Sequence, residues 1–451
     1  MSFTPPRIVP PASPRGRISF VTAFIRNPLE VVPRAAYEED FVAFGGARAP
    51  RAWVTSPALV KAVLLDQRDK FRKLTQIRLL GPLLGKGILT SEGAHWRWQR
   101  AAAAPMFRPQ ELGSFVPAFV RAAGDALARW RAAPQGAVRN VEEDMTRVTF
   151  DVIAATLLPS ADQAFADEVQ RSVQQFQRFG GWELLYAQLN LPRSLPRPGM
   201  FGGPRAVRRL RSMVAGLVRA RIASGAGPDD LLARLIAARD PETGGAMDEE
   251  QLVDNLLTFY LAGHETTAKA LTWTLYLLAR SPEWTAALAG EIGNVTGGAA
   301  VTAENVERLV LVQQVIKESM RLYPPAPMMS RQAVEDCEID GRQIRAGTSV
   351  LMPIYAIHRH ARRWERPDEF DPARFAPAAE EAMPRYQFMP FGAGPRVCIG
   401  RSFALTEATA ILATLVAGAR FEPVPGHEPT PVARVTLIPK GGMPLKVFAT
   451  T

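Results

Sequence analysis

Cysteine is scarce in this chain, with only two residues in 451, Cys337 and Cys398. So few cysteines exclude a fold that depends on a disulfide framework, and they fit the reducing conditions of a cytoplasmic location. A cysteine in such a chain is therefore a candidate for chemistry rather than for cross-linking.

Long apolar runs are missing too, since no stretch of about 18 residues is apolar enough to span a membrane. The amino-terminal segment 1–27 is rich in proline and basic residues and lacks the apolar centre of a signal peptide. We therefore expect no membrane anchor. From 28 to 451 the composition does not shift and no linker interrupts it, so we predict a single domain there.

Histidine is also rare, with five residues, and His264 has no second histidine one helical turn away. We therefore do not expect His264 to bind a metal. The net charge of +10 is carried largely by arginines scattered through amphipathic segments. Nucleic acid is one interpretation of this charge, but a basic face for an acidic protein partner explains it at least as well. We expect no nucleic-acid partner.

Helical periodicity is what the sequence does have. It extends over most segments from about 28 to 238, including 28–44. In two later segments apolar and polar residues alternate instead, as in strands. One alternates around the turn dipeptide Asp340-Gly341, and the other, 433–449, is interpreted as a second hairpin. We predict a mainly helical protein with a small β portion.

The longest predicted helix begins at Asp248, a plausible cap, and continues to about Arg280. Its middle is apolar on nearly every face, which predicts a buried helix. The exception is AGHETT, where Glu265 and Thr266 place a carboxylate and a hydroxyl at a position where burial is costly. A solvated surface turn explains this segment as well as a groove in which an acid and an alcohol relay protons.

Two pairs of side chains share a helical face by their spacing. Glu318 and Arg321 lie three residues apart on a helix that is predicted to end at Tyr323, before two prolines. Trp96 and Arg100 lie four residues apart and offer an indole N–H and a guanidinium to one anion. Each pair, taken alone, is explained more simply as part of an ordinary amphipathic helix.

Near the carboxyl terminus, the proline-punctuated stretch 364–375 contains Arg374 and aromatic side chains that need packing partners, so we predict an ordered meander. The most specific motif follows it, with the spacing F-x-x-G-x-R-x-C-x-G. Its fixed positions are Phe391, Gly394, Arg396, Cys398 and Gly400. In a chain of this length such a pattern arises by chance less than about once in ten thousand tries.

This last motif closely resembles the haem-binding loop of the cytochrome P-450 superfamily, the haem-thiolate monooxygenases. The other motifs resemble those of the same family in its own order: W-x-x-x-R, A-G-x-E-T-T, E-x-x-R, the meander and then the cysteine loop. The resemblance extends from about residue 28 to the carboxyl terminus. It implies the P-450 fold, in which haem lies between a long central buried helix and the helix after the cysteine loop.

The resemblance implies a role for each matching residue. The cofactor would be haem b, with the Cys398 thiolate as the ligand of its iron. The residues expected at the haem are Trp96, Arg100, Ala262, Gly263, Arg331, Phe391, Arg396, Cys398 and Gly400. Glu265 and Thr266 match the catalytic acid–alcohol pair that delivers protons during dioxygen activation. The residues expected to form a buried ion network with a structural role are Glu318, Arg321 and Arg374.

Position in the family predicts an apolar substrate pocket, formed by the loop 74–89, the long helix, the turn 327–329 and the tip near Leu437. The expected lining residues are Leu79, Leu83, Phe259, Ala262, Met328, Met329 and Leu437. They predict a hydrophobic small-molecule substrate: a fatty acid, a terpenoid or a steroid-like molecule. Ordinary core packing explains any one of them equally well. AGHETT together with HRH at 358–360 resembles a branch that includes bacterial fatty-acid hydroxylases, which favours a lipid.

The resemblance also implies partners. The chain ends without a flavin or iron–sulfur domain, so electrons would come from a separate ferredoxin or flavodoxin and its NAD(P)H-dependent reductase. We expect a monomeric, cytoplasmic monooxygenase that uses dioxygen. A peroxide-driven peroxygenase usually lacks the acid–alcohol pair, and a non-catalytic haem-thiolate binding protein has no need for one, so these are the less favoured alternatives.

Overall fold

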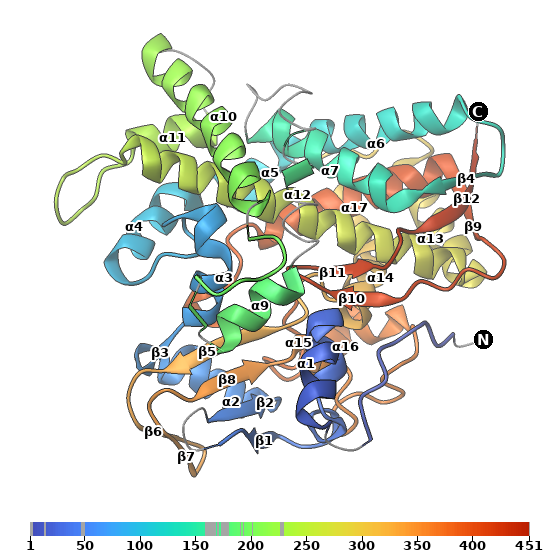
Figure 1. The fold of residues 1–451 in the computed structure, drawn as a ribbon. Coiled ribbons are helices and arrows are strands. Elements are labelled where there is room, and N and C mark those ends of the chain that lie inside the picture. Colours follow the sequence, from blue (N-terminus) through green and yellow to red (C-terminus); the bar gives the residue numbers. More distant parts are fainter. Residues whose placement is uncertain are drawn as a thin grey trace. The chain divides into compact units, whose positions relative to one another are not determined.

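A computed structural model describes residues 3–450 of the chain except 13–14, 47–49, 158–167, 169–170, 173–179, 190, 193, 201 and 226–229. The described part is mainly helical with a small β portion, as predicted (Figure 1). The chain divides into two compact units. The first comprises Met1–Arg72, Leu112–Thr149 and Glu265–Thr451, and the second comprises Lys73–Glu111 and Phe150–His264.

A mixed β-sheet in the first unit supports the cysteine loop. Its strands are β1 (Phe41–Phe44), β2 (Arg51–Val54), β3 (Phe71–Arg72), β5 (Met329–Ala333) and β8 (Ser349–Met352). They run in the order β1-β2-β8-β5-β3, with β2 and β8 parallel and the other neighbours antiparallel. Val350 and Met352 of β8 are buried in one core with Met389, which lies where the cysteine loop begins. The sheet thus fixes the amino-terminal side of that loop.

The helical prediction for 28–44 is wrong. Pro28–Val31 and Arg34–Tyr37 form short 3-10 turns, and Phe41–Phe44 is β1. Pro33 separates the two turns and has no N–H group with which to continue a helix. β1 then pairs antiparallel with β2, a partner that the local periodicity does not reveal.

The first of the two predicted hairpins is confirmed (Figure 1). β6 (Cys337–Ile339) pairs antiparallel with β7 (Arg342–Ile344). Asp340 and Gly341 at the turn have positive φ angles of 49° and 72°. Positive φ at both central positions is the geometry that favours an Asp-Gly dipeptide in a tight hairpin.

The second predicted hairpin, in 433–449, is wrong. The strands concerned are β4 (Ala137–Asn140), β9 (Ala419–Pro423), β10 (Pro431–Ala433), β11 (Leu437–Pro439) and β12 (Pro444–Ala449). β11 pairs with β10, whereas β12 pairs with β4 and β9 in a different sheet. Between them, Gly442 has a φ of 87° and fits against Asn140, 2.6 Å from where its Cβ would lie. The two glycines of the expected turn therefore lead the chain away to more distant partners.

Helices α6 (Val116–Arg131) and α17 (Arg401–Gly418) pack together in the first unit. Phe403 of α17 meets Phe119 of α6 edge to face, with ring centroids 5.1 Å apart. Because α17 follows the cysteine loop directly, this packing fixes the carboxyl side of the loop. The other helices that lie wholly in this unit are α1 (Arg17–Arg26), α2 (Pro57–Lys61), α13 (Pro282–Thr296), α14 (Val310–Leu322), α15 (Ile354–Ile357) and α16 (Pro377–Ala382).

The second unit is built from helices in its described part. They are α3 (Leu74–Leu84), α4 (Gly93–Ala103), α9 (Gly180–Leu189), α10 (Gly202–Ser224) and α11 (Leu231–Ala237), with parts of α5 (Pro109–Leu112), α7 (Val141–Thr156) and α12 (Glu249–Ala279). The loop predicted over 74–89 is therefore wrong for its first part. Five of the eleven residues of α3 are leucines, which like Gln76 and Arg78 are good helix formers, and Gly85, with a φ of 51°, ends the helix.

The helix α12 continues from the second unit into the first and agrees with the longest predicted helix. Asp248 caps it as predicted, because its carboxylate accepts a hydrogen bond from the Gln251 N–H at 2.8 Å. The Gln251 side chain accepts one from the Asp248 N–H at 2.9 Å, which completes a capping box. Most of its side chains are buried. No helix within the described ranges is long and apolar enough to cross a bilayer.

Candidate functional site

Cys398 lies in a loop that its own backbone hydrogen bonds close. The Cys398 N–H donates to the Phe391 carbonyl, and the Val397 N–H donates to the Gly394 carbonyl, each at 3.0 Å. Two residues after the cysteine, Gly400 precedes the first turn of α17. The cysteine is exposed, whereas the other residues of 391–400 are half-buried. This thiol is accessible, and it lies close in sequence to the start of α17.

The loop packs tightly against the rest of the first unit. Gly394, with a φ of 70°, faces the π-helical turn Ala62–Asp66, and a Cβ on it would lie 2.4 Å from the Leu64 carbonyl oxygen. Gly392 faces Met329, whose Sδ lies 3.6 Å from the position of a Cβ. These two approaches hold the loop against the 62–66 turn and the start of β5.

Two arginines that the resemblance assigns to the haem belong to the same unit. Arg396 ends a 3-10 turn within the loop and is half-buried. Arg331 of β5 is buried, and its guanidinium donates to the Ser330 carbonyl at 2.8 Å. Met329, two residues before Arg331 on the strand, contacts the loop at Gly392. Because alternate residues of a strand share a face, β5 brings Arg331 towards the side of the strand that meets the loop.

The predicted pair Glu318 and Arg321 forms a buried ion pair on α14. Both side chains are completely buried, and Arg321 donates through Nε and Nη2 to the two carboxylate oxygens at 2.7 Å each. Its remaining donors reach the carbonyls of His358, Pro367 and Glu369 at 2.6 to 2.9 Å. The fork geometry of the guanidinium thus ties α14 to three points of the chain around the meander.

The third member of the predicted network, Arg374, also reaches this carboxylate. Its Nε lies 3.6 Å from Glu318 Oε1, and its Nη2 donates to the Arg366 carbonyl at 3.0 Å. The Asp371 N–H donates to the same Glu318 oxygen at 2.9 Å. The structure therefore brings all three predicted residues of the ion network together, and the meander is ordered as expected.

Glu265 is buried, so the surface-turn interpretation of AGHETT is wrong for this residue. Its side chain is 7% exposed, and its Oε1 accepts a hydrogen bond from the Thr436 hydroxyl at 2.7 Å. Thr436 lies just before β11, in a segment that no sequence pattern connects with this helix. Thr266, the next residue, is half-buried. An acid and an alcohol are thus adjacent on α12, and a third residue fixes the acid.

In the part of α12 that belongs to the second unit, three neighbouring residues have different environments: Ala262, Gly263 and His264. Ala262 is exposed. A Cβ on Gly263 would lie 2.7 Å from Ile153 Cδ1 of α7, so close helix packing accounts for this glycine. His264 is buried, and its Nδ1 lies 2.7 Å from the Tyr260 carbonyl, which is the environment of a histidine satisfied within the core.

Trp96 and Arg100 share one face of α4, as predicted. The Arg100 Cζ lies 5.8 Å from the centroid of the Trp96 ring, and both residues are half-buried. At this distance the ring attracts the guanidinium by a cation–π contact. The indole N–H and the guanidinium donors therefore occur together on one helical face of the second unit.

The residues predicted to line the substrate pocket are buried to different degrees. Leu79 of α3 and Met328 before β5 are half-buried, whereas Leu83 of α3 is buried. Phe259 of α12 stacks on Phe107, with ring centroids 5.7 Å apart.

Leu437 has the environment of a core residue. It is fully buried, its N–H donates to the Pro325 carbonyl at 2.9 Å, and its carbonyl accepts from the Trp273 indole at 3.1 Å. Its backbone therefore connects β11 with α12 and with the turn that follows α14.

The helix α17 contains a buried carboxyl group that the sequence analysis missed. Glu407 is 1% exposed, and neither of its oxygens has a hydrogen-bond partner of normal geometry among the described residues. Burial raises the pKa of Glu407 to about 8, an effect that the Thr267 hydroxyl of α12 opposes. The signal available in the sequence was a glutamate in an otherwise apolar helical run, nine residues after Cys398.

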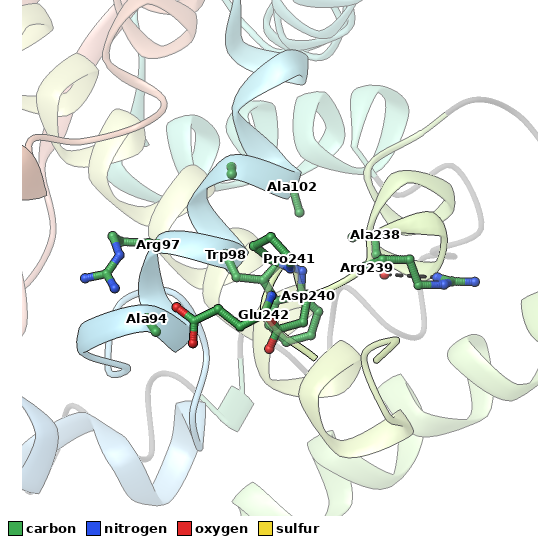
Figure 2. A pocket seen from close by; sticks show the side chains of 10 residues that line it. Ala94, Arg97, Trp98, Ala102, Ala238, Arg239, Asp240, Pro241 and Glu242 are labelled. Carbon is green, nitrogen blue, oxygen red and sulfur yellow. Dashed lines mark hydrogen bonds between the residues drawn. The ribbon is translucent and has the colours of Figure 1, made fainter. Parts of the chain in front are cut away.

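A surface cavity of about 460 Å³ lies in the second unit, between α4 and the turn after α11 (Figure 2). Its lining residues are Ala94, Arg97, Trp98, Ala101, Ala102, Ala238, Arg239, Asp240, Pro241 and Glu242. None of them was predicted to contact substrate. The two arginines and two acids of this lining also differ from the apolar pocket that the resemblance implies.

Comparisons with known proteins find counterparts that span nearly the whole chain. The family profile described as Cytochrome P450 matches residues 34–445. The chain is 34% identical to the Cyclooctat-9-en-7-ol 5-monooxygenase of Streptomyces melanosporofaciens, over 90% of this chain and 87% of that protein. It is 32% identical to Cyclooctatin synthase of the same organism, over 91% and 89%. The crystal structure of the cytochrome P450DA heme domain is similar with a TM-score of 0.85 and 25% identity, over 98% of both chains. The predicted fold is confirmed.

Proposed function

This chain belongs to the cytochrome P450 family and is a P450 monooxygenase, and from that premise we propose that its substrate is an apolar, terpenoid-like small molecule. The observation that carries this substrate class is the similarity to the two Streptomyces enzymes, whose names refer to cyclooctat-9-en-7-ol and cyclooctatin. The apolar character of Leu79, Leu83, Phe259, Met328 and Met329 supports it. A pocket lined by such side chains selects a ligand by shape and apolar area.

The family implies a haem cofactor, and we propose haem b with Cys398 as the ligand of its iron. The residues present fit this group in kind: an accessible cysteine in a rigid loop at the start of a helix, and arginines suited to carboxylates. When bound, the haem supplies the activation of dioxygen for insertion of one oxygen atom into the substrate. The chain holds the thiolate in place through the closed backbone of 391–398.

The proposed contacts of the haem carboxylates come from four side chains. Arg396 and Arg331 in the first unit, and Trp96 and Arg100 in the second, offer N–H donors that suit these anions. The shielded positions of both arginines in the first unit support the assignment. Other proposed haem neighbours are Phe391, Gly400, Ala262 and Gly263. Of the last two, the exposure of Ala262 supports its assignment, whereas packing against Ile153 accounts for Gly263.

We propose that Glu265 and Thr266 move protons. Insertion of one oxygen atom of dioxygen consumes two electrons and two protons and releases the other oxygen atom as water. A buried carboxyl group next to an alcohol can accept a proton and pass it on over short distances. The hydrogen bond from the Thr436 hydroxyl holds the Glu265 side chain in one rotamer. These features support Glu265 as the residue that takes up protons and Thr266 as the residue that delivers them.

A structural role is proposed for Glu318, Arg321 and Arg374. Their contacts join α14 to the meander, which precedes the cysteine loop in the chain. Removing one partner of a buried ion pair leaves the other charge without compensation. The network is thus proposed to maintain the loop rather than to take part in the reaction.

Electrons are proposed to come from a separate ferredoxin or flavodoxin and its NAD(P)H-dependent reductase. The net charge of +10 supports an acidic partner, since opposite charges steer the encounter. We further propose a cytoplasmic monomer with a single catalytic domain over 28–451. The low cysteine content, two residues in 451, supports reducing conditions.

Turnover tests the substrate class. The purified protein is given a ferredoxin, its reductase and NAD(P)H, and is compared on a cyclic terpenoid alcohol, a fatty acid and a steroid. We expect an oxygenated product from the terpenoid in preference to the other two, and none from the Cys398→Ala variant. A preference for the fatty acid would contradict the proposed class. Faster turnover with hydrogen peroxide than with the reductase would indicate a peroxygenase, and binding without product would indicate a non-catalytic haem protein.

A further inference from the structure

A histidine outside the proposed catalytic residues makes a direct hydrogen bond to the start of the cysteine loop. The Met389 N–H donates to His358 Nε2 at 3.0 Å. His358 is completely buried, and its own carbonyl accepts a hydrogen bond from Arg321 Nη1 at 2.9 Å. One residue thus connects the buried ion pair of α14 with the loop that carries Cys398.

The connection continues along the loop through backbone hydrogen bonds. The Gly392 N–H donates to the Met389 carbonyl at 3.0 Å, and the Cys398 N–H donates to the Phe391 carbonyl at 3.0 Å. Gly392 follows Phe391 directly in the chain. The position of the Met389 peptide therefore influences the position of the Phe391 carbonyl, which accepts the hydrogen bond from the Cys398 N–H.

The bond to Met389 requires a neutral imidazole with its Nε2 unprotonated. Burial, Arg321 and Arg359 together lower the pKa of His358 to about 3, so the ring is neutral at physiological pH. The carbonyls of Met320 and Arg321 act in the opposite direction on this pKa, and neither makes a hydrogen bond of normal geometry with Nδ1. A neutral ring has one acceptor nitrogen, and the Met389 N–H occupies it.

We propose that His358 is a positioning residue for the thiolate ligand, acting as the hydrogen-bond acceptor that sets the start of the cysteine loop. This inference rests on the proposed function, in which Cys398 binds the haem iron. Without an acceptor at this place, the buried Met389 N–H lacks a partner, a loss that shifts the loop towards other conformations by about tenfold or more. The thiolate is then misplaced even when the rest of the fold is intact.

His360 offers a matched control in the same segment. It is also completely buried, and it contacts the Glu39 carbonyl at 3.4 Å and accepts from the Arg362 N–H at 3.3 Å. None of these hydrogen bonds reaches the cysteine loop. Replacing either histidine removes a buried imidazole, but only His358 is in contact with Met389.

The experiment compares His358→Phe, His358→Gln and His360→Phe with the wild-type protein. Phenylalanine keeps the ring that packs 5.1 Å from Phe388 but has no acceptor, whereas the glutamine oxygen takes the place of Nε2. Haem content, thermal unfolding and the reduced carbon monoxide spectrum are measured for each. The position of the Soret band separates haem with the thiolate ligand from haem without it.

We expect the ratio of thiolate-ligated to other haem to fall about tenfold or more in His358→Phe. It should be largely restored in His358→Gln. His360→Phe should lose stability without changing the ratio. An unchanged ratio in His358→Phe, or an equal loss in the glutamine variant, would overturn the inference. A wild-type protein without the thiolate band would instead contradict the proposed function.

If His358→Phe does not fold, the comparison of His358→Gln with His358→Asn tests whether an acceptor at the Nε2 position is needed. The two side chains differ by one methylene, and asparagine is too short to place its oxygen at the Nε2 position. We expect the asparagine variant to lose thiolate-ligated haem and the glutamine variant to keep it. Equal ratios in the two variants would contradict a role for the acceptor.

Discussion

The Thr267 hydroxyl on α12 lowers the pKa of the Glu407 carboxyl on α17, against the larger effect of burial. Both groups are buried within the first unit. Neither the carboxyl oxygens nor the hydroxyl has a hydrogen-bond partner of normal geometry among the described residues. A buried carboxyl without a nearby cation is costly to ionise, so Glu407 keeps its proton at neutral pH. Thr267 directly follows Thr266, the alcohol proposed to deliver protons.

The Glu407 pair predicts a pH-dependent stability. The folded-state pKa is raised from 4.5 to about 8, so between these values the folded protein binds a proton that the unfolded chain has lost. The free energy of unfolding attributable to Glu407 therefore falls as pH rises through this window. Glu407→Gln removes the dependence. Thermal unfolding should show that the stability of Glu407→Gln relative to the wild type is higher at about pH 8 than at about pH 5.

The exposed Glu381 supplies the control for this measurement. Glu381→Gln should change the unfolding temperature little and equally at both pH values. A difference between Glu407→Gln and the wild type that stays constant from about pH 5 to about pH 8 would show that Glu407 is ionised in the folded protein.

Replacing Gly394 by alanine should lower the free energy of unfolding by an unusually large amount, although it adds only one methyl group. Alanine there combines a positive φ of 70° with a Cβ placed 2.4 Å from the Leu64 carbonyl oxygen, which belongs to rigid backbone. Gly426 has a similar φ of 75° but open space around it, so Gly426→Ala measures the backbone strain alone. We expect Gly394→Ala to cost at least about 2 kcal/mol more than the control in urea unfolding, and to lower haem content. Equal costs would mean that the 62–66 turn yields without penalty.

Arg321 predicts a loss of stability that charge alone does not restore. Arg321→Ala leaves Glu318 buried without its partner, at a cost of about 3–5 kcal/mol. Arg321→Lys keeps the charge but cannot make the fork contact with both carboxylate oxygens, so it should recover only part of this loss. The exposed pair of Arg342 and Asp340 is the comparison, and Arg342→Ala should have little effect. Denaturant unfolding gives the free energy of unfolding of Arg321→Ala, Arg321→Lys and Arg342→Ala. Full stability in Arg321→Lys would contradict the proposed role of the fork.

Thr436 predicts a defect in proton delivery. Thr436→Val removes the hydroxyl that donates to Glu265 while keeping the shape of the side chain. If Glu265 takes up protons, product formed per NAD(P)H consumed should fall, with turnover reduced about tenfold and substrate affinity unchanged. Thr436→Ser keeps the hydroxyl and should behave as the wild type. Normal coupling of electrons to product in the valine variant would exclude this hydrogen bond from the reaction.

Local signals predicted the parts of the fold that local interactions determine. The bounds of α12 followed from apolar periodicity and from the capping box at Asp248, and the β6–β7 hairpin followed from Asp340-Gly341. The errors occurred where a distant partner decides the structure. β12 pairs with strands from 137–140 and 419–423 instead of its neighbour β11, and β1 forms because β2 is available to pair with it.

The same distinction applies to the candidate site. The cysteine loop, the ion pair and the acid–alcohol pair are defined by spacing within one segment, so they could be found in the sequence. Thr436 and His358 could not, because each acquires its environment from a segment far away in the chain, whereas Glu407 could be noticed only as a glutamate in an otherwise apolar helical run. Thr436 is 171 residues from Glu265, and His358 is 31 residues from Met389.

The central claim is that the Cys398 thiolate holds a haem iron, and the reduced carbon monoxide difference spectrum tests it most directly. The wild-type protein and the Cys398→Ala variant are purified together and compared at equal haem content. We predict a strongly red-shifted Soret band in the wild type and its absence in the variant. A wild-type protein without haem, or a spectrum that the substitution leaves unchanged, would contradict the account.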